Sequence, residues 1–506
     1  MVRLVLMVGI GFGNDEAYTI AGARALHLSY FDHPPLHAWL THASALAFGE
    51  TRWVRLPFVL LFAGTGWLLF LLTRRLYGPR AGVWALLSLN LTPFFTLSAG
   101  GWVVPDGPLL FFLLGAVLAL VPAVLDGPRR TSRPWRAWLA GGLCLGLAGL
   151  SKYNAVLIAL GLVAFVAASP RRRPWLAHPA PYVGGATALV TILPVVAWNA
   201  RHGWASLGFQ TGRALPGSGL HPGWALAMAL GETALVSPWV AAPLAIAAAG
   251  TLRAAVRRPR SGAGGAAPSD DVGPADALLL CLSLPTIAAF TVAPLWASRG
   301  LPHWPMPAWL FLYPILGAWV AGDGHRRFDR RRWAIGSTMA FAALLVAGWG
   351  ATRDGWLSSA LPAATASRDP TLEALDWSGL RGSAPLTDAH AAFAVAVRWM
   401  DAGKVAVALG PEVPTYVFSD DPRQFAFQPA VSRFLGRDAV VVMPAALVPT
   451  RLPPLRPYFA ALDRVEHVWV GREGRPEVDL AVIHARGLLT PFPLPYPRAT
   501  GPEPTP

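Results

Sequence analysis

The residues best suited to chemistry lie in short polar breaks between long apolar runs. The first break holds Asp15 and Glu16. A carboxylate at the edge of an apolar region can act as a general base toward a hydroxyl or an amine, and the low dielectric nearby favours a raised pKa. The alternative is that the acidic pair only ends an apolar helix. We take Asp15 and Glu16 as candidate catalytic carboxylates.

A second break, at 30–37, places Tyr30, Asp32, His33 and His37 around two adjacent prolines. The prolines exclude a regular helix and favour a rigid extended turn. Aspartate and histidine side chains can bind a metal ion, but their spacing here matches no particular metal site. We favour contact between this turn and an anionic group of a substrate.

Later breaks add two more candidates. Asp106, between two prolines, is either a catalytic acid or an ordinary helix cap. Lys152 interrupts an apolar run, where it can hold a phosphate as a point charge or extend its stem to the interface. Other residues that could complete an anion clamp or serve chemistry in these breaks are Asn199, Arg201, His202, Arg299 and His303.

The composition indicates what positions these residues. Of 506 residues, 54% are apolar and 14% are charged, and the mean hydropathy is +0.43. A soluble protein carries about 25% charged residues, so this chain is predicted to be a polytopic α-helical membrane protein. Its many Leu, Val, Phe and Trp residues exclude disorder. Cys144 and Cys281 lie in apolar runs and indicate no disulfide framework.

A bilayer span needs roughly 20 mostly apolar residues, and about ten such runs are present. They are 54–73, 81–99, 107–125, 137–151, 153–169, 180–198, 224–248, 276–297, 305–321 and 333–351. The fourth and fifth are short and could form one kinked element around Lys152.

Arginine sets the predicted orientation, since Lys152 and Lys404 are the only lysines among 42 basic residues. Nineteen arginines lie in the loops 74–80, 129–136, 171–173, 253–260 and 326–332. In a ten-span arrangement these loops share one side, which is the cytoplasm by the positive-inside rule. The net charge of +14 is therefore largely a topology signal, and no nucleic-acid partner is expected. The candidate residues lie on the opposite, extracytoplasmic side.

The ends of the chain differ from its middle. Residues 2–13 form an apolar stub too short to span, which we interpret as a shortened first helix, giving eleven spans in a complete protein. Residues 352–487 are predicted to form a small extracytoplasmic α/β domain, after a transmembrane domain at 1–351. We expect a helix at 389–400 and strands at 405–409, 439–443, 467–470 and 480–483. Residues 488–506 are Pro-rich and predicted to be a disordered tail.

Several strings, in order along the chain, resemble the GT-C glycosyltransferases that use polyprenyl-phosphate sugars, namely family 39, the protein O-mannosyltransferases, and the bacterial aminoarabinose transferases. The strings are Asp15-Glu-Ala-Tyr18, Tyr30-Phe-Asp-His-Pro-Pro-Leu36, Arg55-Leu-Pro57, Pro105-Asp-Gly-Pro-Leu109, Leu150-Ser-Lys-Tyr153, Trp198-Asn199, His202-Gly-Trp204, His303-Trp-Pro-Met-Pro307, Asp421-Pro-Arg-Gln-Phe-Ala-Phe427 and Gly436-Arg-Asp438.

The resemblance implies an enzyme of the plasma (inner) membrane that moves a sugar, with inversion, from a polyprenyl-phosphate donor to a protein, glycan or lipid acceptor outside the cytoplasm. Asp15 then matches the catalytic base and Asp106 the second acid. His33 stands where the aminoarabinose transferases have a phosphate-contacting lysine. No cofactor is expected, and metal dependence is left open.

Two other functions stay open. A lipid or polysaccharide transporter would show repeats or matched broken spans in two halves, and we find no such symmetry. A membrane sensor with a ligand-binding outer domain would not need its loop acids for activity.

Overall fold

The protein is described from a computed structural model that covers residues 2–213, 219–256, 273–297, 300–322, 328–362, 369–387, 390–472 and 475–496. The chain forms two compact units. Unit 1 comprises residues 1–57, 197–207 and 343–506, and unit 2 comprises residues 58–196 and 208–342. The boundaries lie within helices α4, α11, α12 and α18.

Unit 2 is built from long apolar helices. Those that contribute most of its residues are α4 (Leu56–Tyr77), α5 (Pro79–Asn90), α7 (Asp106–Asp126), α8 (Pro134–Gly149), α9 (Ala155–Ala167), α10 (Pro179–Thr191), α13 (Pro222–Val236), α14 (Pro238–Val256), α15 (Pro274–Val292), α17 (Tyr313–Ala321) and the first half of α18 (Arg330–Asp354). Their apolar composition and length follow from the need to satisfy backbone groups internally in lipid.

Each of the ten predicted apolar runs coincides with a helix or a helix pair in the described residues. By length and composition four helices qualify as membrane spans, or seven if each bent pair counts as one. The bent pairs are α5 with 94–101, α10 with α11 (Leu193–Arg201) and α13 with α14, which bend by 82°, 45° and 106°. The remaining runs contain shorter helices at 155–167 and 306–321 and the 16-residue α8. The polytopic helical architecture is therefore confirmed.

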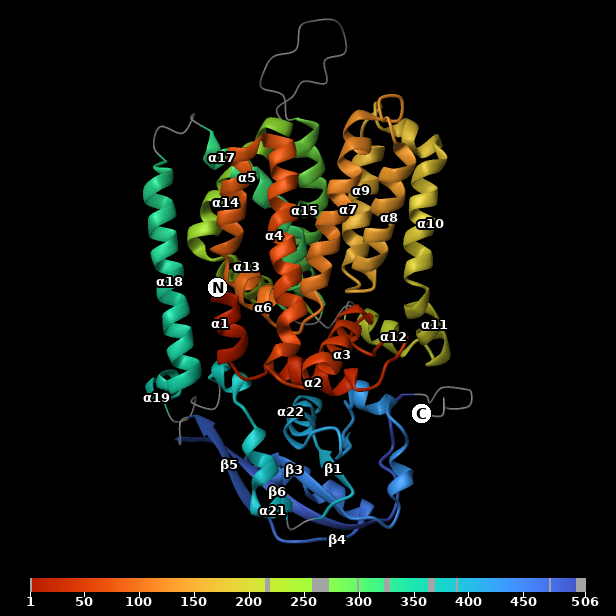
Figure 1. Ribbon diagram of the computed structural model, residues 1–506, viewed down its shortest axis with the longest axis vertical. Coiled ribbons are helices and arrows are strands. Elements are labelled where there is room, and N and C mark those ends of the chain that lie inside the picture. Colours follow the sequence, from red (N-terminus) through yellow and green to blue (C-terminus); the bar gives the residue numbers. More distant parts are fainter. Residues whose placement is uncertain are drawn as a thin grey trace, which may run out of the picture. The chain divides into compact units, whose positions relative to one another are not determined.

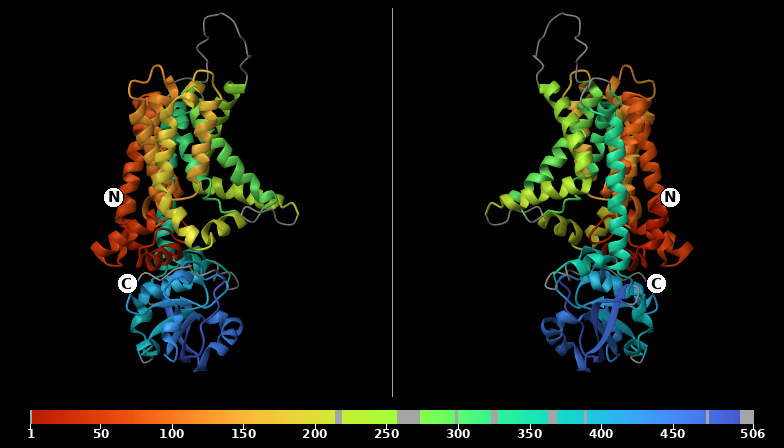
Figure 2. Two further views of the ribbon diagram at one scale, coloured as in Figure 1. Left: turned by 90° about the vertical axis from the view of Figure 1, so that its right-hand side faces the viewer. Right: turned by 90° about the vertical axis from the view of Figure 1, so that its left-hand side faces the viewer.

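Three of the five arginine-bearing turns agree with the predicted alternation, and parts of the other two, at 253–260 and 326–332, lie outside the described residues. In Figure 1, the turns that join α4 to α5, α7 to α8 and α9 to α10 lie at one end of unit 2. Helices α7, α8 and α10 run side by side, and α8 and α10 approach so closely that a Cβ on Gly142 would lie 2.0 Å from the carbonyl oxygen of Gly184. Such close contacts between small residues are typical of membrane helices. Figure 2 shows α13 directed away from the other helices of this unit.

Unit 1 begins with the residues of the N-terminal segment. The apolar stub forms α1 (Val2–Gly9), and α2 (Asn14–Ala23) follows after a short link. The segment between α2 and α3 (Leu36–Phe48) contains no regular helix or strand, as the two prolines predicted, and α3 begins directly after Pro35. A single 3₁₀ turn, η1 (Arg52–Arg55), then leads into α4.

The C-terminal part of unit 1 contains a mixed β-sheet, which confirms the predicted α/β domain (Figure 1). Its strands are β1 (Phe393–Ala396), β2 (Thr415–Val417), β3 (Ala439–Pro444), β4 (Phe459–Leu462), β5 (Glu466–Arg472) and β6 (Arg475–Leu488). The order is β2-β1-β3-β6-β4, and β5 also pairs with β6. Strand β1 is parallel to β2 and β3, whereas β6 is antiparallel to β3, β4 and β5.

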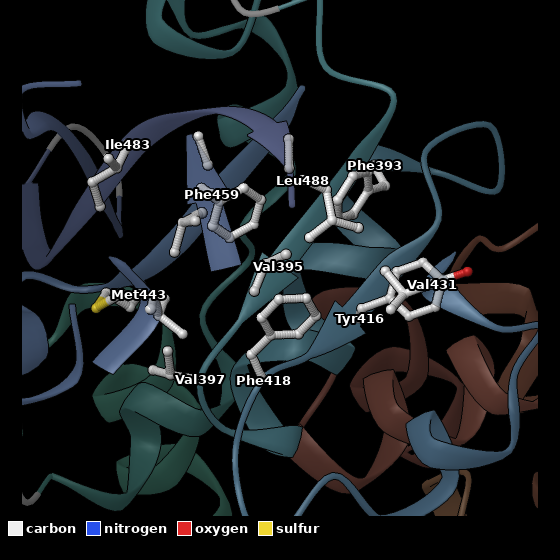
Figure 3. Close-up of a cluster of buried hydrophobic side chains, with 14 of the residues drawn as sticks. Phe393, Val395, Val397, Tyr416, Phe418, Val431, Met443, Phe459, Ile483 and Leu488 are labelled. Atoms are coloured by element: carbon white, nitrogen blue, oxygen red, sulfur yellow. The ribbon is translucent and has the colours of Figure 1, made fainter. Parts of the chain in front are cut away.

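Both faces of the sheet are buried. Phe393 and Val395 face one hydrophobic cluster, shown in Figure 3. Ala394, between them, belongs to a second cluster on the other face, with Val405 and Leu409 of α22 (Trp399–Leu409). Burial on both faces explains why these strands read as continuous apolar runs instead of alternating ones.

Two of the predicted elements in this domain were wrong. The predicted helix at 389–400 contains strand β1, and the predicted strand at 405–409 lies within α22. A strand buried on both faces has no period that separates it from a helix. Gly410 caps the end of α22, and its φ of +83° suits glycine at this position. The strands predicted at 439–443, 467–470 and 480–483 are confirmed as parts of β3, β5 and β6.

The Pro-rich C-terminal segment is partly packed, in contrast to the predicted disorder. The ring of Phe492 stacks on Phe418, with ring centroids 5.2 Å apart. The ring of Tyr496 lies 5.7 Å from that of Phe427 and 4.5 Å from that of Phe31. Aromatic residues thus fix residues up to 496, and the rest of the predicted tail lies outside the described residues. The domain limits at 351 and 487 stay predictions.

Candidate functional site

The predicted site residues divide between the two units. Unit 1 contains Asp15, Glu16, Tyr30, Asp32, His33, Arg201 and His202, and unit 2 contains Asp106 and Lys152. Arg299 lies outside the described residues.

Asp15 and Glu16 are neighbours in the first turn of α2, but their surroundings differ. Asp15 is exposed, whereas Glu16 is 2% exposed. The carboxylate of Glu16 accepts a hydrogen bond of 2.9 Å from the backbone nitrogen of Gly13, the residue that caps the helix. A carboxylate at a helix N-terminus also interacts favourably with the helix dipole. Glu16 therefore fixes the start of α2, and Asp15 is the carboxylate that solvent and ligands can reach.

The partner of Glu16 is Arg55, whose side chain is 1% exposed. Its Nε and Nη2 atoms donate to the two carboxylate oxygens at 2.7 and 2.5 Å. The same guanidinium donates to the carbonyl oxygens of Met7, Ile10 and Gly11 at 2.7–2.8 Å. One arginine thus joins α1, the link after it and α2, and holds in place the turn that carries Asp15.

The turn at 30–37 is anchored from the C-terminal domain. The carboxylate of Asp32 accepts a hydrogen bond from the Tyr18 hydroxyl and forms a 3.0 Å ion pair with Nη1 of Arg423. The guanidinium of Arg423 lies 4.0 Å from the ring centroid of Trp399, which is cation–π geometry. Burial first, and Asp32 second, raise the pKa of Tyr18, so its hydroxyl stays protonated and donates.

Gln424 forms the next link between the same segments. Its backbone nitrogen donates to the Tyr18 hydroxyl at 2.9 Å. Its side-chain Oε1 accepts from the backbone nitrogen of Phe31, also at 2.9 Å. The dipeptide Arg423–Gln424 therefore holds α2 and the turn at 30–37 at three points, and Arg423 adopts a positive φ of 49° to do so.

Lys404 is a further buried cation in unit 1. Its Nζ donates to the carbonyl oxygens of Phe12, Glu373 and Leu375. Burial lowers its pKa to about 8. Phe12 directly precedes the cap of α2, so Lys404 supports the same turn as Arg55. Burial and the nearby Asp15 together raise the pKa of Glu373, which places a second acidic group near the exposed carboxylate.

The other predicted residues of unit 1 have mostly structural contacts. The Tyr30 hydroxyl donates to the carbonyl of Ala25 at 2.9 Å, and burial raises its pKa to about 12. The rings of His33 and His37 meet edge to face at 5.8 Å. The ring of His202 stacks on Trp198 at 4.2 Å.

Two further placements complete the predicted set in unit 1. Asn199 is buried, and its side-chain oxygen accepts from the backbone nitrogen of Leu207 at 3.2 Å. Arg201, at the end of α11, is exposed. Among the residues that the structure describes, no group of three or more His, Cys, Asp or Glu side chains could hold a metal ion.

In unit 2, Asp106 and Lys152 form one buried pair. The Nζ atom lies 3.0 Å from each carboxylate oxygen, and both side chains are about 5% exposed. His303 is close enough that Lys152 helps burial to lower its pKa to about 4, so this imidazole is neutral. Asn154, two residues after Lys152, donates to the carbonyl of Trp304 at 2.8 Å. Asp106 thus occupies the first turn of α7 as the hydrogen-bonded partner of Lys152.

Sequence reasoning missed Arg55, Arg423 and Lys404 as parts of the site. Arg55 and Arg423 occur inside strings that carry the family resemblance, and that was their only signal. Lys404 had a stronger one, because it is one of only two lysines in the chain.

Comparison with known proteins supports the architecture and its class. Residues 32–198 match the family described as dolichyl-phosphate-mannose-protein mannosyltransferase. The lipid A galacturonosyltransferase RgtD of Rhizobium johnstonii is 27% identical over 215 residues, which are 40% of this chain and 44% of that protein. The match therefore spans less than half of the relative.

The fold agrees over a greater length. The crystal structure of ArnT from Cupriavidus metallidurans bound to undecaprenyl phosphate superposes with a TM-score of 0.62 at 16% identity, covering 96% of each chain. The apo structure of the same protein gives 0.61 at 14% identity, covering 96% of this chain and 95% of that one. The family match, the relative and the shared fold together support a membrane glycosyltransferase of the GT-C type.

Proposed function

We propose that this protein transfers a sugar from a polyprenyl-phosphate donor to an acceptor outside the cytoplasm, with inversion at the anomeric carbon. Asp15 removes the proton from an acceptor hydroxyl or amine as that atom bonds to the sugar. The bond between the sugar and the phosphate breaks, and polyprenyl phosphate leaves with the electron pair. The observation that carries this proposal is an exposed carboxylate, Asp15, on a helix turn that the buried Glu16–Arg55 ion pair holds in place.

The geometry supports different roles for the two acidic neighbours. A general base needs access to its substrate, and Asp15 has it. Glu16 is bound to Arg55 through both carboxylate oxygens, so we assign it to positioning. Preorganised groups of this kind cost no rearrangement during the reaction, which is how fixed electrostatics lower a barrier.

The donor assignment draws on the relatives. ArnT was crystallised with undecaprenyl phosphate, and a lipid-linked donor explains why such chemistry takes place in a membrane protein. In this chain we assign the Asp106–Lys152 pair to the polar head of the donor. Two N–H groups of the Lys152 ammonium contact the carboxylate oxygens of Asp106, and the third can donate to a phosphate oxygen. His33 and Arg201 remain proposed phosphate contacts, as do His202 and Arg299.

The side of the membrane follows from the arginine distribution. The turns at 74–80, 129–136 and 171–173 carry ten of the arginines and are assigned to the cytoplasm by the positive-inside rule. The plasma membrane, with the C-terminal domain outside, is therefore the proposed location.

The test is complementation of a deletion strain, followed by mass spectrometry of envelope glycans and lipids. Wild-type protein should restore one glycan or lipid mass that the deletion strain lacks. Asp15→Asn should reach the membrane at normal levels and lower that product by at least about 10²-fold, the usual contribution of a general base. The matched control is Asp420→Asn, an exposed carboxylate of the same unit, which should restore the product fully.

Two results would contradict the proposal. Normal product from Asp15→Asn would remove this residue as the base. A deletion strain that accumulates an unmodified lipid or polysaccharide on the inner side, with no missing sugar linkage, would instead favour a transporter.

A further inference from the structure

A cleft of about 460 Å³ in unit 1 is not used by the mechanism proposed above. One wall is the end of α2 and the turn after it, with His27. The other wall belongs to the C-terminal domain, with Thr415 at the start of β2 and the segment that holds Phe425, Phe427 and Gln428. Its volume lies in the range of roughly 300–1,000 Å³ that is typical of small-molecule sites.

The cleft adjoins residues of the candidate site. The ring of His27 packs edge to face on Tyr30, with ring centroids 5.5 Å apart. The ring of Phe427 lies 5.4 Å from His202 and 5.1 Å from Trp198. A ligand in the cleft would therefore contact the side chains that support the turn at 30–37.

The electrostatics of the cleft favour an uncharged ligand. Arg24 in the wall is bound by Glu50 through two hydrogen bonds of 2.7 and 2.8 Å, so its charge is neutralised. Burial, and then the charge of His202, lower the pKa of His27, which keeps this imidazole neutral near pH 7. No carboxylate occurs among the described residues that line the cleft. A phosphate or a carboxylate would thus find no free cation, and a cationic ligand no anion.

The lining also favours a ligand with hydroxyl groups. Thr415 is 2% exposed, and its Oγ1 has no hydrogen-bond partner among the described residues. A buried hydroxyl without a partner is unfavourable, and a ligand hydroxyl in the cleft would satisfy it. Gln428 adds an amide that can both donate and accept. The phenyl rings of Phe425 and Phe427 offer apolar surface beside these polar groups, the combination found in ligand sites.

We propose that this cleft binds an uncharged sugar ring, and that this ring is a part of the acceptor next to the group that receives the transferred sugar. The role of acceptor rests on the proposed transferase function, whereas the binding of a sugar does not. Hydroxyls of the ring hydrogen-bond to Thr415 and Gln428, and its C–H face packs on Phe427.

The test measures binding directly, on the full-length protein in a detergent without a sugar headgroup, by saturation-transfer NMR. The uncharged probes are methyl β-glucopyranoside, methyl β-galactopyranoside and maltose. Glucose 1-phosphate and methyl glucuronide are the anionic probes, and octanol is the apolar probe. We expect binding of at least one uncharged probe, with affinity about tenfold weaker in Thr415→Val and in Gln428→Ala. Thr450→Val is the matched control, because Thr450 is exposed and its hydroxyl donates to the carbonyl of Leu447 in its own turn.

The outcomes separate this inference from the proposed function. Asp15→Asn should bind the sugar probe as wild type does, so the binding measurement tests the cleft independently of the transfer assay. If the melting curve of Thr415→Val shows that this variant does not fold, the affinity of Gln428→Ala alone decides whether the cleft binds the sugar. Stronger binding of an anionic probe or of octanol, or equal binding by wild type and both cleft variants, would overturn the proposal.

Discussion

Glu16 and Arg55 offer the sharpest test of how the proposed catalytic turn is built. Their side chains are 2% and 1% exposed, and two hydrogen bonds join them. In Arg55→Met the Glu16 carboxylate stays buried with one backbone donor, Gly13, and three carbonyls lose their donor. Removing one partner of a buried ion pair costs about 3–5 kcal/mol. We expect Arg55→Met to lie at the upper end of that range.

Glu16→Gln should cost less, because the guanidinium of Arg55 keeps its three carbonyl acceptors and can donate to the glutamine oxygen. A lost hydrogen bond to a charged group costs about 1.5–3 kcal/mol. The double variant leaves no buried charge at this position. Its total loss should therefore fall short of the sum of the single losses by at least about 1 kcal/mol, the coupling expected of residues in one network.

The assay is unfolding of the purified protein in mixed micelles with increasing sodium dodecyl sulfate, followed by tryptophan fluorescence. Additive losses, within about 0.5 kcal/mol, would show that the two side chains do not act as a unit. Transfer activity per folded molecule supplies a second readout. Folded Glu16→Gln should keep activity within a few fold, whereas Asp15→Asn should lose it. A folded Glu16→Gln as inactive as Asp15→Asn would refute the assignment of Glu16 to positioning.

Three more predictions concern cations that pair with carboxylates or carbonyl groups. Arg423→Gln removes the cation beside Asp32 and should destabilise the protein by about 1.5–3 kcal/mol in the same unfolding assay. Arg433→Gln is the control, because Arg433 is exposed. Lys152→Met should cost about 3–5 kcal/mol, and a second change, Asp106→Asn, should recover part of that loss instead of adding to it. Burial lowers the pKa of Lys404 to about 8, so between that pH and about 10.4 the unfolded chain holds one more proton than the folded chain. The contribution of Lys404 to the free energy of unfolding therefore rises over that interval. Wild type should gain stability from pH 8 to 10 relative to Lys404→Met. An equal change in wild type and variant would contradict the lowered pKa of Lys404.

The membrane architecture could be predicted because it depends on local composition. Each apolar run must satisfy its own backbone within lipid, so length and hydropathy identify the helices without knowledge of their neighbours. The turn at 30–37 was predictable for a similar reason, since proline acts on its own backbone and that of the residue before it. The exchanged helix and strand at 389–409 show the limit of this reasoning. Apolar burial of both faces in β1 removed the alternation that distinguishes a strand.

The sequence indicated the acidic residues of the candidate site but not the basic residues that contact them. Asp15 and Asp32 stand out because acidic residues are rare beside apolar runs. Arg423 meets Asp32 across 391 positions of sequence, and Lys404 meets Phe12 across 392. No local pattern encodes such pairings, because they depend on the folded position of the C-terminal domain. The same holds for Lys152, whose carboxylate partner is 46 residues away.

The two lysines show what the arginine bias of this chain can reveal. Wherever a basic side chain is exposed, the sequence contains arginine, yet Lys152 and Lys404 are each only 5% exposed. A guanidinium is planar and spreads its five donors over a fork, whereas an ammonium is compact and directs three donors from one atom. The Nζ atom of Lys404 donates to three carbonyl oxygens, and that of Lys152 donates to both oxygens of one carboxylate. Arg55 is equally buried and donates to three carbonyls and one carboxylate, so the acceptors alone do not require lysine. The rarity of lysine, which singled out Lys152 in the sequence, applies equally to Lys404, and both lysines are buried cations with fixed acceptors.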